Sequence, residues 1–219
     1  MNRNVLLFDL DGTLLNTLDD LADSMNFALK SAGLPTRPVE SYKYFVGNGM
    51  VKLTERVLPP DKSNDKSVFA QVFDCFMNRY KDHSRDKTAP YENIEKLLDS
   101  LRENGVKIAV VTNKAHDAAQ EVVAHYFGDI FDIVIGQSEQ VKVKPDPSGV
   151  KFVMSELSVN ADECLFVGDS SVDMQTAKNA KTTAIGVLWG FRLKDELCEN
   201  GADYIVLNPM EILKIAKEN

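Results

Sequence analysis

The chain has 219 residues, of which 44% are hydrophobic and 26% charged, so its composition excludes a disordered, collagen-like or low-complexity protein. Acidic residues outnumber basic ones by 33 to 25, for a formal net charge of −8 at pH 7. That charge repels nucleic acid and anionic lipid, so neither is expected as a partner. A small anionic substrate stays compatible with it, because a bound metal ion can reverse the local field.

The cysteines and the apolar stretches point to a protein of the cytoplasm. Cys75, Cys164 and Cys198 are widely spaced, which argues against a disulfide framework or a zinc site and favours reduced thiols. The apolar run near the start is interrupted by Asp9 and Asp11, unlike a secretory leader. No other apolar stretch approaches the ~20 residues of a transmembrane helix. We therefore expect a soluble, cytoplasmic protein.

Six short apolar runs predict β-strands, and they lie at residues 5–8, 108–111, 133–135, 165–167, 184–187 and 204–206. Runs without polar alternation are typical of parallel strands that are covered on both faces. Between them, apolar residues recur at helical spacing, in residues 94–101, 150–157 and 174–180. This alternation predicts an α/β fold with a doubly wound parallel sheet and right-handed crossovers.

The segment from residue 16 to residue 84 breaks this alternation. It has no strand pattern, and Thr17 is expected to N-cap a helix with Asp20 at its third position. A second apolar stripe runs from Val68 to Tyr80. Roughly seventy residues are too many for a loop, so we predict an inserted helical domain at 16–84 and a core domain at 1–15 and 85–219. The alternative is that these helices simply pack on the sheet.

Polar residues follow the predicted strands, at the edge where open α/β sheets bind ligands. They are Asp9, Asp11, Thr112, Lys144, Asp169 and Asp173. Each residue alone is compatible with an ordinary role, such as capping a helix or forming a turn. Together they predict one polar cluster, because the carboxyl ends of parallel strands meet at the same edge.

These groups suit phosphoryl transfer. Asp9, Asp169 and Asp173 offer hard oxygen ligands for Mg²⁺, and a carboxylate beside such an ion can attack phosphorus. Thr112 and Lys144 offer a hydroxyl and a cation to the charge on the transferring group.

Asp11 is two residues beyond Asp9, at a turn that Gly12 makes possible. We expect it to protonate the leaving group and then to activate water. A phospho-acceptor signalling module is the non-enzymatic alternative, since it also combines acidic residues with a threonine and a lysine. Such a module would need neither an acid/base next to the nucleophile nor a long helical insertion.

Four motifs resemble those of the haloacid dehalogenase superfamily of phosphatases. Residues 9–13, Asp-Leu-Asp-Gly-Thr, are similar to the first motif, Thr112 to the second, Lys144 to the third and residues 168–173 to the fourth. The resemblance covers nearly the whole chain, and the insertion resembles the cap of the subclass whose cap follows the first strand. It implies a sheet of order 3-2-1-4-5 and a cap that closes over the site and excludes bulk water.

The resemblance also implies a role for each residue of the cluster. Asp9 would be the nucleophile and Asp11 the acid/base. Mg²⁺ would bind Asp9, the backbone carbonyl of Asp11 and Asp169, with Asp173 nearby. The residues expected to take part in catalysis are Asp9, Asp11, Thr112 and Lys144. Those expected to bind the phosphoryl group are Gly12, Thr112, Asn113 and Lys144.

Within the superfamily the sequence resembles phosphoglycolate phosphatases. Residues 46–49, Val-Gly-Asn-Gly, are similar to their substrate loop, and residues 110–114 and 188–190 fit the same group. Two positions depart from that pattern, with Asn16 where many relatives carry Asp and Tyr91 where they often carry Gly. Pyrophosphatases, sugar-phosphate phosphatases and phosphomutases of the superfamily share much of the pattern and are the alternatives.

The loop at residues 46–49 suits a small anion. The loop is expected to approach a ligand closely, because glycines such as Gly47 and Gly49 have no side chain to cover the backbone N–H, and Asn48 adds an amide. Lys43 or Arg192 could add positive charge. We therefore expect a small phosphorylated metabolite, 2-phosphoglycolate, as the substrate of a monomer or homodimer.

Overall fold

The computed structural model describes residues 4–217; residues 1–3 and 218–219, at the ends of the predicted core domain, lie outside the described residues. The chain divides into two compact units, one made of residues 4–15 and 90–217 and the other of residues 16–89. The helical unit therefore ends at residue 89 and not at the predicted residue 84. The reason is that the segment after residue 84 is bonded to the first helix of the helical unit, as described below.

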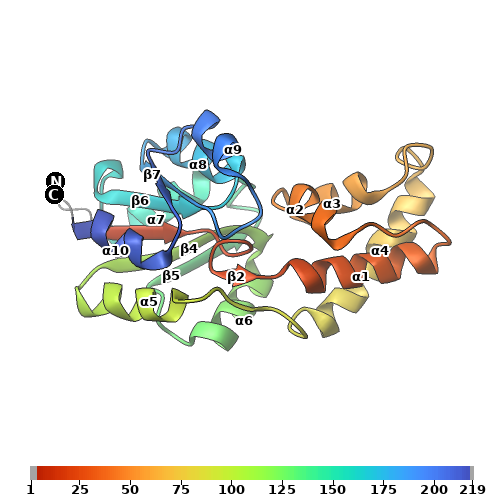
Figure 1. Cartoon of the computed structure of the whole chain (residues 1–219), viewed down its shortest axis with the longest axis horizontal. Coiled ribbons are helices and arrows are strands. Elements are labelled where there is room, and N and C mark those ends of the chain that lie inside the picture. Colours follow the sequence, from red (N-terminus) through yellow and green to blue (C-terminus); the bar gives the residue numbers. More distant parts are fainter. Residues whose placement is uncertain (1–3, 218–219) are drawn as a thin grey trace. The chain divides into compact units, whose positions relative to one another are not determined.

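Six parallel strands form the sheet of the first unit (Figure 1). In spatial order they are β5 (Ile133–Gln137), β4 (Lys107–Ala115), β1 (Val5–Phe8), β6 (Cys164–Gly168), β7 (Thr183–Val187) and β8 (Tyr204–Val206). The predicted order of the first five strands is confirmed, and β8 adds a sixth strand at one edge. Because β1 lies between β4 and β6, with Phe8 paired to both Val110 and Val167, its end is the centre of the sheet's functional edge.

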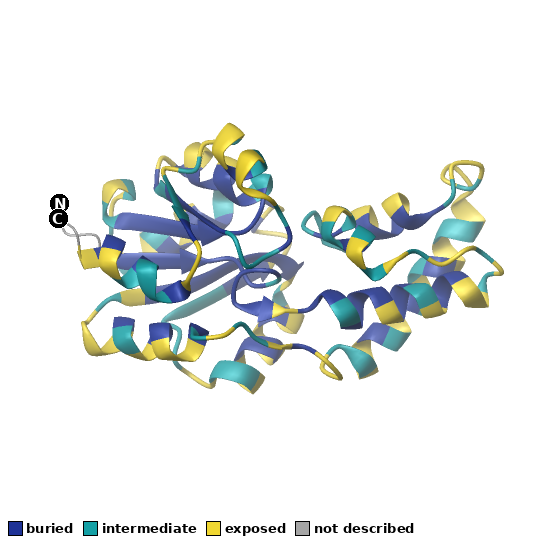
Figure 2. Cartoon of the chain, viewed as in Figure 1, coloured by how far each residue is buried: buried dark blue, intermediate teal, exposed yellow. Residues whose placement is uncertain are grey.

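Helices cover both faces of this sheet, which accounts for the unbroken apolar runs of its strands. One face carries α5 (Ile94–Glu103), α6 (His116–Phe127) and α10 (Pro209–Lys217), and the other carries α7 (Ser148–Leu157), α8 (Ser171–Ala180) and α9 (Lys194–Glu199). A short 3₁₀ turn, Ala161–Glu163, precedes β6. In Figure 2 the inner strands are mostly buried, whereas the edge strands β5 and β8 are partly intermediate and the helices alternate between buried and exposed residues. Within residues 4–217, no helix combines the length and the apolarity that crossing a membrane requires.

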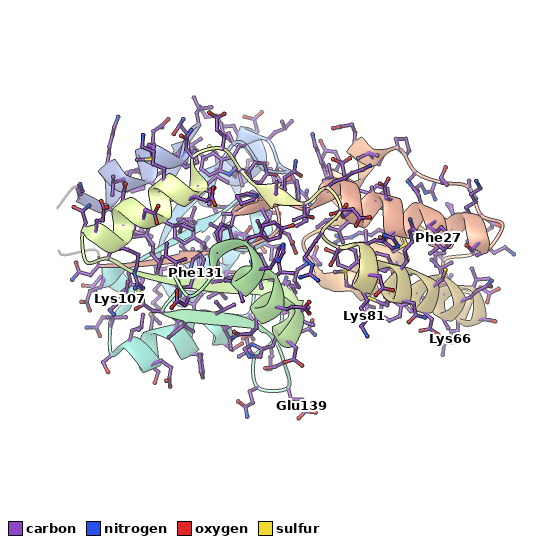
Figure 3. All side chains as sticks on the ribbon, turned by 90° about the horizontal axis from the view of Figure 1, so that it is seen from below. Phe27, Lys66, Lys81, Lys107, Phe131 and Glu139 are labelled. Carbon is purple, nitrogen blue, oxygen red and sulfur yellow. The ribbon has the colours of Figure 1, made fainter. Side chains whose placement is uncertain are left out.

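The second unit consists of helices. They are α1 (Leu18–Ser31), a 3₁₀ turn at Val39–Ser41, α2 (Tyr42–Phe45), α3 (Gly49–Val57) and α4 (Lys66–His83). Buried apolar side chains such as Met25 on α1 and Phe76 on α4 join the two long helices. Figure 3 labels Phe27, Lys66 and Lys81 on the same two helices, and all three side chains are exposed.

The start of α1 differs from the predicted capping box. Thr17 precedes the helix, but its hydroxyl makes no capping hydrogen bond and, among the described residues, has no partner. Asp20, only 2% exposed, accepts hydrogen bonds from Lys87 N (3.0 Å), Thr88 N (2.8 Å) and Thr88 Oγ1 (2.7 Å). Three distant donors satisfy the buried carboxylate better than one local N–H can.

The two links between the units, β2 (Leu15–Asn16) and β3 (Ala89–Pro90), pair with each other.

Candidate active site

The end of β1 and the turn after it position two carboxylates. The Asp9 N–H donates to the carbonyl of Val167 at 2.9 Å, so Asp9 still follows the line of the strand. Gly12 then has a φ of +91°, a left-handed conformation that turns the chain back. The side chain of Asp9 is 12% exposed and that of Asp11 is 15% exposed. Both carboxylates therefore lie at the rim of the sheet's buried edge.

Two glycines let the backbone come close to Asp169, which follows β6. A Cβ at Gly12 would collide with the carboxylate of Asp169, and a Cβ at Gly190 would collide with Asp169 and with the carbonyl of Gly12. The Phe191 N–H donates to Asp169 Oδ2 at 2.7 Å. Residues 190 and 191 thus orient Asp169, a role that the family likeness of residues 188–190 did not specify.

Lys144 connects two of the predicted acids. Its Nζ lies 2.7 Å from Asp9 Oδ1 and 2.7 Å from Asp173 Oδ1, and its side chain is 4% exposed. Asn113 accepts a hydrogen bond from Lys144 N at 2.6 Å and donates to Lys144 O at 3.3 Å, so it holds the backbone of this lysine. Asp173 Oδ2 in turn accepts from the backbone N–H and hydroxyl of Ser170. Burial alone would lower the pKa of Lys144, but Asp173 and Asp9 outweigh burial and raise it.

Three buried carboxylates gather around this lysine. Oxygen atoms of Asp9, Asp169 and Asp173 lie within 4.8 Å of one another. When all three carboxylates are ionised, the single ammonium of Lys144 leaves an excess of negative charge in this group. Burial raises the pKa of Asp9 to about 7, with Lys144 opposing the shift and Asp173 adding to it, and burial also raises the pKa of Asp169. A divalent cation with oxygen ligands fits both the donor set and the missing charge.

Lys114 belongs to the same edge, although it was not among the predicted site residues. Its side chain is 2% exposed, and its Nζ lies 3.2 Å from Asp11 Oδ2. The Lys114 N–H donates to Thr112 Oγ1 at 3.2 Å, which places the predicted Thr112 in this cluster. The signal that could have identified Lys114 is the strand period, because residues two apart on a strand share a face.

The predicted substrate residues lie in the helical unit, with Gly47 and Asn48 between α2 and α3 and Gly49 as the first residue of α3. Gly47 and Gly49 have φ values of +117° and +83°. Arg56 donates to the carbonyl of Phe45 at 2.9 Å and to Asn48 Oδ1 at 2.7 Å, so it orders this loop. The two residues considered for added charge form ion pairs, Lys43 with Glu40 (2.7 Å) and Arg192 with Glu196 (3.3 Å).

Known proteins match this chain over almost its whole length. The chain is 33% identical over 214 residues to the phosphoglycolate phosphatase of Mannheimia succiniciproducens, which covers 95% of this chain and 96% of that protein. It is 31% identical over 218 residues to the phosphoglycolate phosphatase of Psychrobacter arcticus, covering 96% and 91% respectively. The crystal structure of a proposed phosphoglycolate phosphatase from Lactobacillus delbrueckii subsp. bulgaricus matches with a TM-score of 0.93 and 32% identity over 99% of both chains.

The family match agrees with the four motifs and with the sheet. A family model described as haloacid dehalogenase-like hydrolase matches residues 6–187, which include the strands that carry Asp9, Thr112 and Asp169. The chain therefore belongs to the haloacid dehalogenase-like hydrolases.

Proposed function

We propose that this protein is a Mg²⁺-dependent phosphomonoester hydrolase that forms an aspartyl-phosphate on Asp9 and acts on 2-phosphoglycolate. The proposal rests mainly on what surrounds Asp9. This residue forms an ion pair with Lys144 and lies in one group with the carboxylates of Asp169 and Asp173. A second carboxylate, Asp11, follows two residues later. The names of the relatives from Mannheimia and Psychrobacter support the substrate.

The residues that would hold Mg²⁺ are Asp9, Asp169 and the backbone carbonyl of Asp11, with Asp173 beside them. When bound, the ion would polarise the phosphoryl group and offset the charge of an anionic substrate. Both oxygens of Asp173 already accept hydrogen bonds, from Lys144 and Ser170, so its main part is to hold Lys144 beside Asp9.

The reaction has two steps that share these side chains. An oxygen of Asp9 bonds to phosphorus while the bond to the leaving oxygen breaks, and the leaving oxygen takes a proton from Asp11. Water then attacks the same phosphorus, gives its proton to Asp11, and phosphate departs from Asp9. Lys144 and Thr112 donate to the phosphoryl oxygens, where negative charge collects.

The helical unit supplies selectivity as a cap, because the core groups recognise only the phosphoryl end of a substrate. The loop of Gly47, Asn48 and Gly49 would bind the carboxylate of a two-carbon phosphoester.

The three cysteines are free thiols, which supports a place in the reducing cytoplasm.

A hydrolysis screen tests this proposal. With Mg²⁺, kcat/KM for 2-phosphoglycolate should exceed that for hexose phosphates and pyrophosphate by at least about tenfold, or ~1.4 kcal/mol. EDTA should abolish the activity and Mg²⁺ should restore it. Full activity without a metal ion would contradict the metal dependence.

The other outcomes of the screen separate the alternatives. A preference for pyrophosphate or a hexose phosphate would overturn the substrate and leave the phosphatase chemistry standing. Activation by a sugar bisphosphate with little phosphate release would indicate a phosphomutase. A stable phosphoprotein without turnover would indicate a phospho-acceptor module.

A further inference from the structure

The two carboxylate oxygens of Asp11 have different surroundings. Oδ2 lies 3.2 Å from Nζ of Lys114. Oδ1 is buried and, within the part of the chain that the structure describes, has no hydrogen-bond partner. A buried carboxylate oxygen without a donor is unfavourable by about 1–3 kcal/mol unless a ligand completes it. The orphaned atom thus marks where a reacting group would hydrogen-bond to Asp11.

Lys114 is held in place by the fold. It lies near the end of β4, which is hydrogen-bonded to β1 on one side and β5 on the other, and its side chain is 2% exposed. Lysines are almost never fully buried unless they are paired with an acid. The two buried lysines of the edge contact different acids, since Lys144 contacts Asp9 and Asp173 whereas Lys114 contacts Asp11.

We infer that Lys114 is a positioning residue for Asp11. The lysine holds Oδ2 of Asp11, so that Oδ1 of Asp11 is the oxygen that exchanges the proton with the reacting groups. An ammonium group has only donors, so the oxygen that faces it must be an acceptor and the carboxyl proton must sit on the other oxygen. This inference rests on the proposed function, in which Asp11 is the acid and base.

The proton balance of the two steps fits this geometry. In the first step the proton leaves Oδ1 for the leaving oxygen as the phosphorus–oxygen bond breaks. In the second step a proton from the attacking water returns to Oδ1. Lys114 keeps its three protons throughout.

The test compares three two-carbon phosphates of similar size in the variant Lys114→Met. Ethyl phosphate and 2-phosphoglycolate release an alkoxide that needs a proton, whereas acetyl phosphate releases acetate, which leaves as a stable anion. The quantity measured is kcat/KM, because it ends with departure of the leaving group and is blind to the later hydrolysis of the phosphoenzyme.

The expected result is a selective loss. Lys114→Met should lower kcat/KM about 10- to 100-fold for both alkyl phosphates, part of the ~10²–10⁴-fold that a general acid contributes, and less than about 3-fold for acetyl phosphate. Lys114→Arg, which keeps a cation, should recover part of the loss. Lys151→Met, which removes an exposed lysine of α7, is the control and should change none of the three values.

A double variant separates positioning from an independent role. If Lys114 acts through Asp11, adding Lys114→Met to Asp11→Asn should lower the ethyl phosphate rate by less than about 3-fold further. The ratio of ethyl to acetyl phosphate activity is taken within one preparation, so a partly unfolded variant still gives a valid ratio. Lys114→Gln, which is one atom shorter than lysine and keeps an N–H donor without the charge, provides a second measurement of this ratio.

Three other outcomes would overturn either the positioning role of Lys114 or the proposed function. Equal losses for ethyl and acetyl phosphate would overturn the positioning role and leave the phosphatase function intact. A loss confined to 2-phosphoglycolate would mean that Lys114 binds the substrate carboxylate and would also overturn it. If the wild-type protein with Mg²⁺ hydrolysed none of the three phosphates, the proposed function itself would fail, and this inference with it.

Discussion

At the scale of single residues, Asp9 and Asp11 differ in their partners. Asp9 pairs with Lys144 inside a group of three acids, while Asp11 pairs with Lys114 and keeps one oxygen without a partner in the described residues. Asp9→Asn should leave only trace turnover, because an amide cannot form the phosphoenzyme. Asp11→Asn should lower kcat by ~10²–10⁴-fold, because it removes proton transfer and keeps the nucleophile.

Rapid-quench trapping of labelled phosphoenzyme distinguishes these two variants. Asp11→Asn should still transfer the phosphoryl group from acetyl phosphate to the protein, and Asp9→Asn should not. Substantial turnover in Asp9→Asn together with an inactive Asp11→Asn would mean that the nucleophile is misassigned.

At the scale of elements, the buried carboxylate of Asp20 joins the start of α1 to the segment before β3. Asp20→Ala removes the acceptor that three donors share, the N–H groups of Lys87 and Thr88 and the hydroxyl of Thr88. We expect the free energy of unfolding in urea to fall by about 1–3 kcal/mol. Asp19→Ala is the matched control, since Asp19 lies in the same first turn of α1. Equal effects of the two substitutions would assign the loss to the helix dipole and not to the hydrogen bonds.

The loop between α2 and α3 offers a second test at this scale. Gly47→Val should lower kcat/KM for 2-phosphoglycolate by about tenfold and reduce the preference over hexose phosphates, because a β-branched residue resists the left-handed backbone of Gly47. Gly33→Val is the control, since Gly33 also has a positive φ (+70°), and at both positions a Cβ would meet open space. We expect Gly47→Val and Gly33→Val to have similar melting temperatures, and only Gly47→Val to lose preference for 2-phosphoglycolate over hexose phosphates. If both variants lost selectivity equally, the loop would have no special part in binding.

At the scale of the whole molecule, the acidic cluster couples stability to pH. The pKa of Asp9 rises from the ordinary 3.8 to about 7, and that of Asp169 also rises, so the folded chain holds protons that the unfolded chain has released. Stability of the metal-free protein therefore falls as the pH rises from about 4 to about 7. We expect a higher melting temperature in EDTA at about pH 5.5 than at about pH 8.

Magnesium and one variant provide the controls for that measurement. Saturating Mg²⁺ should raise the melting temperature most at the higher pH, because the ion binds the ionised carboxylates of the folded state. Asp9→Asn should show a smaller pH effect in EDTA than the wild-type protein. The same pH effect in both proteins would exclude Asp9 as its source.

Much of the fold follows from spacing along the chain. The six apolar runs become the six strands of the sheet, because residues without polar alternation are stable only where both faces are covered. The helix at α5 follows from Ile94, Leu97, Leu98 and Leu101, which share one face and are all buried. Asp9 and Asp169 could be expected at one edge, because the ends of neighbouring parallel strands meet there.

Contacts between distant segments were decided by the tertiary structure. Asp20 bonds to Lys87 and Thr88 and not to its own helix start, and Lys114 reaches Asp11 on the neighbouring chain segment. The sequence alone determined the six strands of the sheet, the helices α1, α4, α5, α7 and α8, and the acids at the sheet edge, since these depend on apolar runs, a period of 3.6 residues and strand direction. Which lysine meets which carboxylate depends on strand register and side-chain burial, so only the folded sheet paired Lys144 with Asp9 and Lys114 with Asp11.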